Sequence, residues 1–258
     1  MKRMIWGLWA LLLLLSCGEN RQKTISHRLT LLTYNVGVFS KYEESGIKGV
    51  AQLIRESGAT LVALNELDSC NRRHKTYQLK DLAQELGGWS FAFASAFPYA
   101  DGAYGNGVVS KEPIAASYKV QLPKEDGSEP RSVAVVETAD CVFAAVHLDH
   151  KSSGAALRQM QTVNEWFTAH FTGYDKPVFL CGDFNVTPDS AVIAEADNCW
   201  TLLSGTEFTH STTNLKHCID YIFAFKAAAP VRVEGAQVYK KDADRLSDHY
   251  PVRVTVTY

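Results

Sequence analysis

The segment 176–185, which reads KPVFLCGDFN, constrains the fold of this chain more than any other stretch. A run of apolar residues ends there at Gly182, a pattern typical of a buried strand that stops at a loop. Asp183 and Asn185 follow; if the backbone stays extended, both side chains point to one side and Phe184 points into the core. Because α/β sheets bind ligands beyond the carboxyl ends of their strands, the segment predicts a polar site. The alternative is an ordinary Asp/Asn turn.

The N-terminus has the pattern of an export signal. Lys2 and Arg3 precede an apolar run over 4–15, which is too short for a spanning helix of about 20 residues. The run ends in LLSC at 14–17, which resembles the bacterial lipobox, whose cysteine is lipidated and becomes the mature N-terminus. We therefore expect lipidation at Cys17. The alternative is an ordinary signal peptide in which this cysteine occurs by chance.

This pattern divides the chain into a signal peptide over 1–17, a polar tether over 18–27 and a folded domain over 28–258. Since two or more acyl chains anchor a protein stably, we expect an exported protein that is lipid-anchored to a bacterial membrane. The anchor would lie on the periplasmic or the cell-surface face. No low-complexity tract or linker interrupts 28–258, so we expect one domain, and we expect it to be a monomer.

The charge balance bears on nucleic-acid binding. The formal charge is −2 at pH 7, and it becomes more negative once Lys2 and Arg3 leave with the signal. That balance argues against nonspecific DNA binding through a broad basic face. It does not exclude a nuclease that meets phosphate through a metal.

The cysteines give no sign of a zinc site. Without Cys17 they are odd in number and none has CxxC spacing, and their disulfide pairing stays open. They are Cys70, Cys141, Cys181, Cys199 and Cys218.

Hydrophobic periodicity predicts more strands than helices, with the helices mainly between the early strands. The predicted strands are 28–36, 59–65, 131–136, 141–148, 178–181, 218–225, 231–239 and 251–258. The predicted helices are 47–57, 79–86, 155–170 and 191–196. The aromatic, Gly/Ala-rich segment 91–104 is interpreted as a loop. This arrangement favours stacked sheets with helices outside them.

Polar residues recur at the ends of the apolar strands. They are Asn35, Glu66, Asn106, His147, Asp183, Asn185, Asp220, Asp248 and His249. Burying carboxylates close together is costly unless a cation or a hydrogen-bond donor compensates. Oxygen ligands of this kind suit Mg²⁺, Mn²⁺ or Ca²⁺, and a hard cation with carboxylates and histidines suits phosphate-ester hydrolysis.

The motifs that contain these residues occur in the order of a known family. They are TYNV at 33–36, LNEL at 64–67, YGNGVVS at 104–110, VHLD at 146–149, GDFN at 182–185, IDYI at 219–222 and LSDH at 246–249. Taken together, they resemble the endonuclease/exonuclease/phosphatase superfamily, which includes DNase I-like nucleases, inositol-phosphate phosphatases and sphingomyelinases. The resemblance implies a four-layer α/β sandwich, with two mixed β-sheets packed face to face and helices on both outer sides.

The resemblance also implies roles at the metal and at the attacking water. Glu66 would be the principal ligand of Mg²⁺ (or Mn²⁺), helped by Asn35 and, from the far side, by Asp248. Asp183 would orient or deprotonate the water, and Asn185 would hold that water or the phosphate.

The remaining implied roles surround the phosphate. His249 would stabilise the developing charge or protonate the leaving oxygen, while Asp220 would fix its tautomer and raise its pKa. His147 would contact the phosphate from the other flank, and Asn106 would be a substrate contact. The other histidines have no such motif and receive no role; they are His27, His74, His170, His210 and His217.

The sequence therefore predicts a lipid-anchored, Mg²⁺-dependent phosphodiesterase or phosphatase. Its expected substrate is a phosphorylated small molecule or a phospholipid head group. A DNase I-like nuclease is the first alternative, but the segment 91–104 offers few cations for a nucleic-acid backbone. A surface binding module that kept the fold and lost the chemistry is the second alternative.

Overall fold

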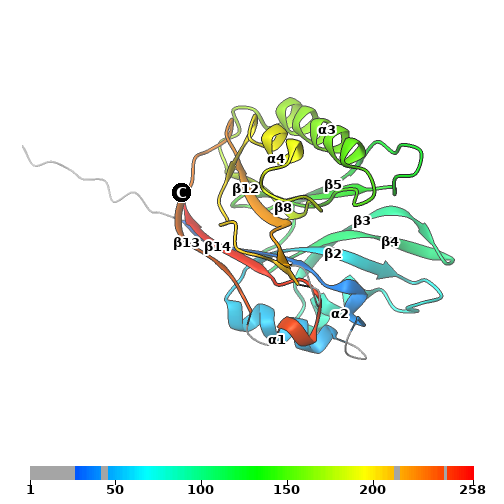
Figure 1. Ribbon diagram of the computed structural model, residues 1–258. Coiled ribbons are helices and arrows are strands. Elements are labelled where there is room, and N and C mark those ends of the chain that lie inside the picture. The colour runs from blue at the N-terminus through cyan, green and yellow to red at the C-terminus, as the bar shows by residue number, and fades with distance from the viewer. Residues whose placement is uncertain (1–26, 42–45, 212–215, 241–242) are drawn as a thin grey trace, which may run out of the picture.

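The computed structural model describes residues 27–41, 46–211, 216–240 and 243–258 (Figure 1). The predicted signal peptide, with Cys17, lies outside these ranges, as does all but the last residue of the tether. Among the described helices, none combines the length and the hydropathy needed to cross a bilayer.

One six-stranded sheet contains both termini of the described domain. Its strands, in spatial order, are β13 (Arg232–Val238), β14 (Val252–Thr257), β1 (Arg28–Asn35), β2 (Leu61–Ser69), β4 (Gly102–Ser110) and β3 (Ser90–Tyr99). β1 and β2 run parallel, whereas β1 pairs with β14 and β2 pairs with β4 in antiparallel fashion. The sheet is therefore mixed.

The second six-stranded sheet is mixed as well, because β7 and β8 are parallel and their other neighbours are antiparallel. Its strands, in spatial order, are β5 (Ala116–Gln121), β6 (Ser132–Glu137), β7 (Val142–His147), β8 (Val178–Asp183), β12 (Asp220–Phe225) and β9 (Trp200–Leu202). A short pair, β10 (His210–Ser211) and β11 (Lys216–His217), stands apart from both sheets.

Helices cover the outer face of each sheet (Figure 1). α1 (Ile47–Ser57) and α2 (Gln78–Glu85) pack on the first sheet, and α3 (Ser153–Phe171) and α4 (Ala191–Ala196) pack on the second. Two short 3₁₀ turns complete the set, η1 (Gly37–Phe39) and η2 (Ala243–Arg245). The predicted four-layer α/β sandwich is confirmed.

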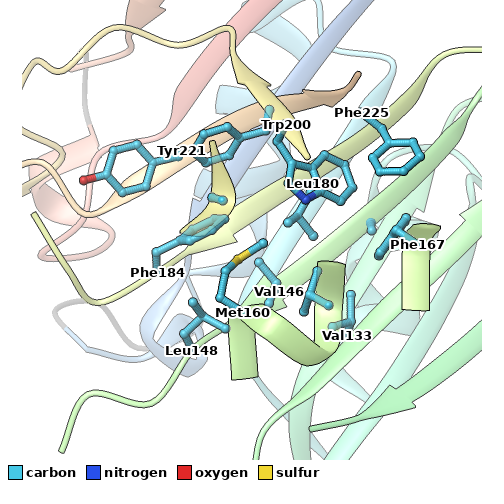
Figure 2. Packing of buried hydrophobic residues seen from close by; sticks show 14 of the residues in the cluster. Val133, Val146, Leu148, Met160, Phe167, Leu180, Phe184, Trp200, Tyr221 and Phe225 are labelled. Atoms are coloured by element: carbon cyan, nitrogen blue, oxygen red, sulfur yellow. The ribbon is translucent and has the colours of Figure 1, made fainter. Parts of the chain in front are cut away.

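Residues alternating along one strand supply two different cores. In β7, Ala144 and Val146 pack under α3 (Figure 2), whereas Phe143 and Ala145 pack between the sheets. A strand that is buried on both faces reads as a continuous apolar run, which is why the sequence marks β7 and β8 so clearly. Each such side chain stabilises the fold by roughly 1.5–3 kcal/mol when it is fully buried.

The segment 91–104, interpreted from sequence as a loop, instead forms most of a hairpin made of β3 and β4. Phe91 and Phe93 pack toward α2, while Ala92 and Ala94 face the core between the sheets. Small residues there let the sheets approach, and their low β-propensity hid the strand alternation from sequence reasoning.

All five cysteines of the described domain are free. Cys141 and Cys181 are buried between the two sheets, where they pack as small apolar residues.

Candidate active site

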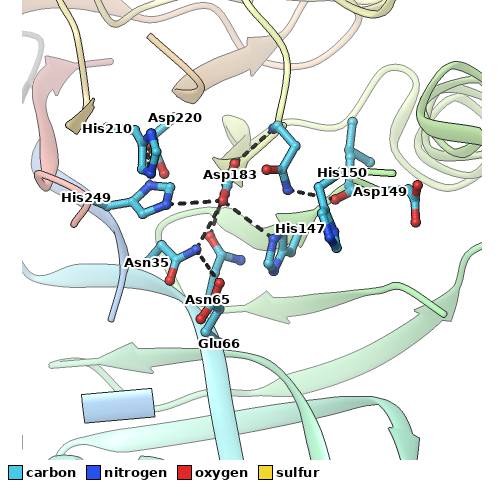
Figure 3. Close-up of polar contacts among 12 residues, drawn as sticks. Asn35, Asn65, Glu66, His147, Asp149, His150, Asp183, His210, Asp220 and His249 are labelled. Carbon is cyan, nitrogen blue, oxygen red and sulfur yellow. Dashed lines mark hydrogen bonds and ion pairs between the residues drawn. The ribbon is translucent and has the colours of Figure 1, made fainter. Parts of the chain in front are cut away.

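The predicted site residues come together where strands of both sheets end at one edge of the sandwich (Figure 3). Parallel pairing sets His147 of β7 opposite Asp183 of β8, and antiparallel pairing sets Asp220 of β12 opposite Asp183 as well. In the other sheet, Asn35 ends β1 beside β2, which carries Glu66. Strand pairing within each sheet and the packing of one sheet on the other therefore bring distant parts of the chain to one place.

Asp183 lies at the centre of this group, with its side chain buried. Its Oδ2 atom accepts a hydrogen bond from Asn35 Nδ2 at 3.0 Å and lies 3.5 Å from His147 Nε2 and 3.7 Å from His249 Nε2. Burial raises the pKa of Asp183 to about 6, although the positive charge of His249 opposes the rise. The carboxylate is therefore ionised at pH 7, yet basic enough to accept a proton.

The backbone after β8 does not stay extended, which corrects the geometry expected from sequence. Asn185 has a φ of +55°, and its N–H donates to Asp183 Oδ1 at 2.8 Å, so the chain turns sharply there. Gly182 is needed just before the turn, because a Cβ would lie 1.8 Å from the carbonyl oxygen of Val146 on β7. Phe184 points into the core as predicted, and Asn185 still lines the cleft described below.

Glu66 is presented to the site by an irregularity in β2. The pairing with β4 shifts register between Leu64 and Leu67, and Glu66 has a φ of +59°. That left-handed conformation costs a residue other than glycine roughly 1–2 kcal/mol. Strain of this kind is typical of functional positions, and here it turns the Glu66 carboxylate toward Asn35, whose Nδ2 donates to Glu66 Oε1 at 3.1 Å.

Asn35 serves as a donor to both acids in this structure. Its Nδ2 reaches Asp183 and Glu66, while its Oδ1 accepts the N–H of Gly37 at 3.1 Å. The amide oxygen expected from sequence to ligate a metal is thus turned to the backbone, and the amide nitrogen orients the two carboxylates.

His249 is held by a carboxylate behind it. Its Nδ1 lies 2.9 Å from Asp220 Oδ2, and the same oxygen accepts a hydrogen bond from Thr209 Oγ1 at 2.6 Å. Burial would lower the pKa of His249, but Asp220 and Asp183 outweigh burial and raise it to about 10. The ring is therefore an imidazolium at pH 7 that presents Nε2–H to Asp183.

His147 is held by a guanidinium instead. Arg131, also buried, places Nη1 3.0 Å from His147 Nδ1 and Nη2 3.0 Å from His150 Nδ1. Because a guanidinium only donates, His147 Nδ1 must accept, so the proton of the neutral ring sits on Nε2. Burial and the Arg131 charge hold the pKa of His147 well below its usual range.

Asp248 lies at the other side of the opening. Its Oδ2 contacts the ammonium of Lys41 and lies 3.4 Å from His210 Nε2. Burial would raise the pKa of Asp248, but His210 and Lys41 hold it well below its usual range. The His210 ring stands 4.7 Å from that of His249, so a histidine that received no role from sequence lies in the site.

Asn106 and Asn65 form the floor beneath these residues. Asn106 donates to Ser132 O at 2.8 Å and accepts from Asn65 Nδ2 at 3.1 Å, and Asn65 Oδ1 accepts the N–H of Asp183 at 3.0 Å. Asn106 is buried and is not among the residues that line the cleft. It links the two sheets and helps to fix Asp183.

Sequence reasoning missed several of these contacts for a common reason. The residues it missed are Lys41, Asn65, Arg131, Thr209 and His210. Asn65 carried a usable signal, because it is polar within a buried strand and directly precedes Glu66. The other four act through partners that are distant along the chain.

The acids and histidines line a cleft of about 300 Å³. Among the residues that the structure describes, two sets of side chains have ligand atoms close enough together to share a cation: His210 with Asp248 and His249, and Asp183 with Asp220 and His249. Glu66 belongs to neither set but lines the same cleft. The carboxylates of Glu66, Asp183 and Asp248 line the cleft, and Asp248 already attracts the Lys41 ammonium, so these oxygen donors fit a hard divalent cation.

Comparison with solved structures places this architecture among known folds. A Bacteroides thetaiotaomicron endonuclease/exonuclease/phosphatase family protein superposes with a TM-score of 0.70 at 19% identity, over 90% of this chain and 96% of that one. A mannosyl-6-phosphatase from the same organism gives 0.71 at 19% identity, over 89% and 100% of the two chains. ANGEL2, a 2′,3′-cyclic phosphatase, gives 0.72 at 11% identity, over 90% and 95%.

A search of curated proteins found no match. The model of the endonuclease/exonuclease/phosphatase family matches residues 32–249, which include every predicted catalytic and metal residue described above. The chain belongs to the endonuclease/exonuclease/phosphatase family.

Proposed function

We propose that this protein hydrolyses phosphate esters, as a phosphodiesterase or a phosphatase, with Mg²⁺ or Mn²⁺ as its cofactor. The observation that carries the proposal is the setting of Asp183. A buried carboxylate with a pKa of about 6 faces two imidazole Nε2 atoms, at 3.5 and 3.7 Å, and both of these nitrogens carry protons. A proton acceptor between two donors matches a water that attacks a phosphoryl group.

The proton transfers follow from these contacts. A water oxygen forms a bond to phosphorus while the ester P–O bond breaks on the opposite side, and Asp183 Oδ2 takes the water proton. The imidazolium of His249 donates its Nε2 proton to the developing negative charge or to the leaving oxygen. His147 offers a neutral Nε2–H to another phosphoryl oxygen, and the side chain of Asn185 lies at the same opening.

Glu66 and Asp248 would hold the cation, with His210 beside Asp248. A bound divalent cation would neutralise charge on the phosphoryl group. Lys41 contacts Asp248 and would have to turn away when a cation binds there.

We propose a phosphorylated small molecule or a phospholipid head group as the substrate. Two structural relatives bear the names mannosyl-6-phosphatase and 2′,3′-cyclic phosphatase, both of which denote action on phosphate esters. Because the chain has a net negative charge, we rank a nucleic acid below these two substrates.

We also propose export and lipidation at Cys17, followed by anchoring at the periplasmic or cell-surface face of a bacterial membrane. Detergent phase partitioning of the full chain and of Cys17→Ala tests this. The full chain should enter the detergent phase and Cys17→Ala should not. Equal partitioning of the two would contradict the anchor.

The catalytic proposal is tested with the purified full chain on phosphorylated sugars, nucleotides, phospholipids and plasmid DNA, with Mg²⁺ or with EDTA. We expect hydrolysis that EDTA abolishes and that Asp183→Ala lowers by several orders of magnitude. Asp189→Ala serves as the control, because Asp189 is exposed, accepts a hydrogen bond from Thr187 and is not among the residues that line the cleft. Hydrolysis that is indifferent to Asp183→Ala would reject the mechanism. Absence of hydrolysis throughout would favour a binding module, and cleavage of plasmid DNA alone would favour a nuclease.

A further inference from the structure

A second hollow opens beside the catalytic cleft, with a volume of about 230 Å³. Glu66, Tyr104 and Glu129 line both hollows, so the two adjoin each other. Its remaining walls include Phe97 and Tyr99 from the β3–β4 hairpin and Arg73 from the segment after β2. We call this hollow the aromatic subsite. Since it adjoins Glu66, a group attached to a phosphate in the cleft would extend into it.

Three aromatic rings form one wall of the aromatic subsite. The ring of Phe97 stands 5.3 Å from that of Tyr104 and 6.2 Å from that of Tyr99, and the Tyr99 and Tyr104 centroids are 6.5 Å apart. Tyr99 is 38% exposed, and burial raises the pKa of Tyr104, so its phenol is neutral. Such rings offer apolar faces for stacking and hydroxyls for hydrogen bonds.

Contacts within the protein hold this wall in place. Arg72 N donates to Ala100 O at 2.7 Å, which ties the segment after β2 to the tip of the hairpin. Arg73 lies over the Tyr99 ring at 4.8 Å, and its guanidinium donates to the buried Asp68 through Nε at 2.7 Å and Nη2 at 2.9 Å. A wall that is held by such contacts loses little freedom on binding, which favours a rigid ligand.

Two charged residues of the aromatic subsite, Arg73 and Glu129, are paired within the protein. Arg73 is matched by Asp68, and Glu129 Oε2 lies 3.1 Å from Arg131 Nη2. A second phosphate or another anion would therefore meet no unmatched positive charge there. The edges of a paired guanidinium and a paired carboxylate suit hydroxyl groups, which can both accept and donate.

Building on the function proposed above, we propose that the aromatic subsite binds the group that carries the phosphate and that this group is a neutral, polyhydroxylated ring, a monosaccharide. The C–H face of such a ring stacks on Tyr99 and Phe97, while its hydroxyls reach Arg73 and Glu129. An acyclic alcohol lacks a face for stacking, and a diacylglycerol would place an apolar mass against the charged edges of the subsite.

Steady-state kinetics of the full chain with Mg²⁺ test this proposal. We expect kcat/KM for glucose, mannose or galactose 6-phosphate to exceed that for glycerol 3-phosphate at least about tenfold. Tyr99→Ala should lower kcat/KM about five- to tenfold for the preferred hexose phosphate, through KM, and leave glycerol 3-phosphate unchanged. Tyr118→Ala is the matched control, because Tyr118 is 42% exposed on β5, outside both hollows, and it should change neither substrate.

Several outcomes would overturn the proposal. They are a preference for adenosine monophosphate or glycerol 3-phosphate over every hexose phosphate, or a Tyr99→Ala effect that is absent or equal for both substrates. Calorimetric binding in EDTA separates this proposal from the proposed function. Tighter binding of a hexose 6-phosphate than of glycerol 3-phosphate, lost in Tyr99→Ala, would support the subsite even without turnover, and equal binding would overturn it.

Discussion

The two histidines beside Asp183 are alike in position and opposite in chemistry. His147 and His249 are 3% and 6% exposed, and both point Nε2 at Asp183 Oδ2. Behind His249 stands the Asp220 carboxylate, and behind His147 stands the Arg131 guanidinium. The pKa of one ring rises to about 10 and that of the other falls. Since burial is nearly equal, the residue behind each ring decides its charge.

Because of this difference in charge, His249 and His147 have different roles in the proposed reaction. His249 brings a mobile proton and a positive charge to the phosphate, whereas His147 brings a neutral donor whose tautomer is fixed. Two imidazolium rings at this spacing would repel each other and would pull the pKa of Asp183 down, which would weaken it as a base. Because Asp220 and Arg131 carry opposite charges, only one of the two rings is protonated twice, and the Asp183 carboxylate stays basic between two N–H donors.

The largest expected effect comes from removing the partner of His249. Asp220→Asn keeps the shape but takes away the charge and permits the wrong tautomer, so we expect kcat to fall about 10³–10⁴-fold. Asp197→Asn, at the exposed C-terminal end of α4, is the control and should leave kcat unchanged. A loss of less than tenfold in Asp220→Asn would mean that Asp220 does not set the state of His249.

The partner of His147 should matter less. Arg131→Met removes the donor to Nδ1 and leaves a neutral ring neutral, so we expect a loss of about 10- to 100-fold. A purely structural role for Arg131 would leave the tautomer unchanged. ¹⁵N shifts of the histidine rings distinguish the two cases: His147 should carry its proton on Nε2 in the parent chain and should populate Nδ1–H in Arg131→Met. Arg131→Lys keeps a cation whose ammonium can donate to Nδ1 and should restore the Nε2–H form.

The pH profile of kcat/KM tests both flanks at once. Asp183 must be ionised to act as a base, so the rate should rise with pH through about 6. His249 must keep its proton, so the rate should fall as pH rises through about 10. Asp220→Asn removes the charge that does most to raise the His249 pKa, so its alkaline limb should move toward lower pH. The same charge raises the Asp183 pKa to a lesser degree, so the acid limb should move the same way by less. A shift of the acid limb alone would assign the groups the other way round.

The surroundings of His147 and His249 also show which features could be predicted from the sequence. Apolar runs were enough to predict stacked sheets with helices outside them, because strands buried on both faces show as continuous apolar segments. The four-layer sandwich and the joint site of His147, Asp183 and His249 followed from the resemblance of their motifs to the family. The partner of His249 was found through its motif. Arg131 was read only as the first residue of a strand, since nothing local shows that its side chain turns inward to reach His147.

The turn at Asn185 and the β3–β4 hairpin were not predicted from the sequence, each for a different physical reason. Asn185 adopts a positive φ because Asp183 Oδ1 captures its N–H, a local competition that strand periodicity does not contain. The hairpin carries alanines where the sheets close, and these residues weaken the strand signal. His210 lies on a two-residue strand, too short to show any periodicity.

The smallest expected effect is a change in the free energy of unfolding when Asp183, the carboxylate between the two histidines, is replaced. Because the folded-state pKa of Asp183 is about 6, above the ordinary value of 3.8, the ionised form is disfavoured by the fold at pH 7. Asp183→Asn should therefore raise the free energy of unfolding by roughly 1–3 kcal/mol at pH 7 in EDTA. The gain should disappear below about pH 4, where the carboxyl is protonated in both states.

A second buried acid gives the matched comparison for that last effect. Hydrogen bonds from Arg73 and His74 hold the pKa of Asp68 below its usual range, against the effect of burial. The ionised form of Asp68 thus favours the fold, and Asp68→Asn should lower the free energy of unfolding at pH 7. Urea denaturation of both variants measures the two signs. If Asp183→Asn were destabilised like Asp68→Asn, the two histidines would hold Asp183 as a structural ion pair, and its basicity would have to come from the bound cation and substrate.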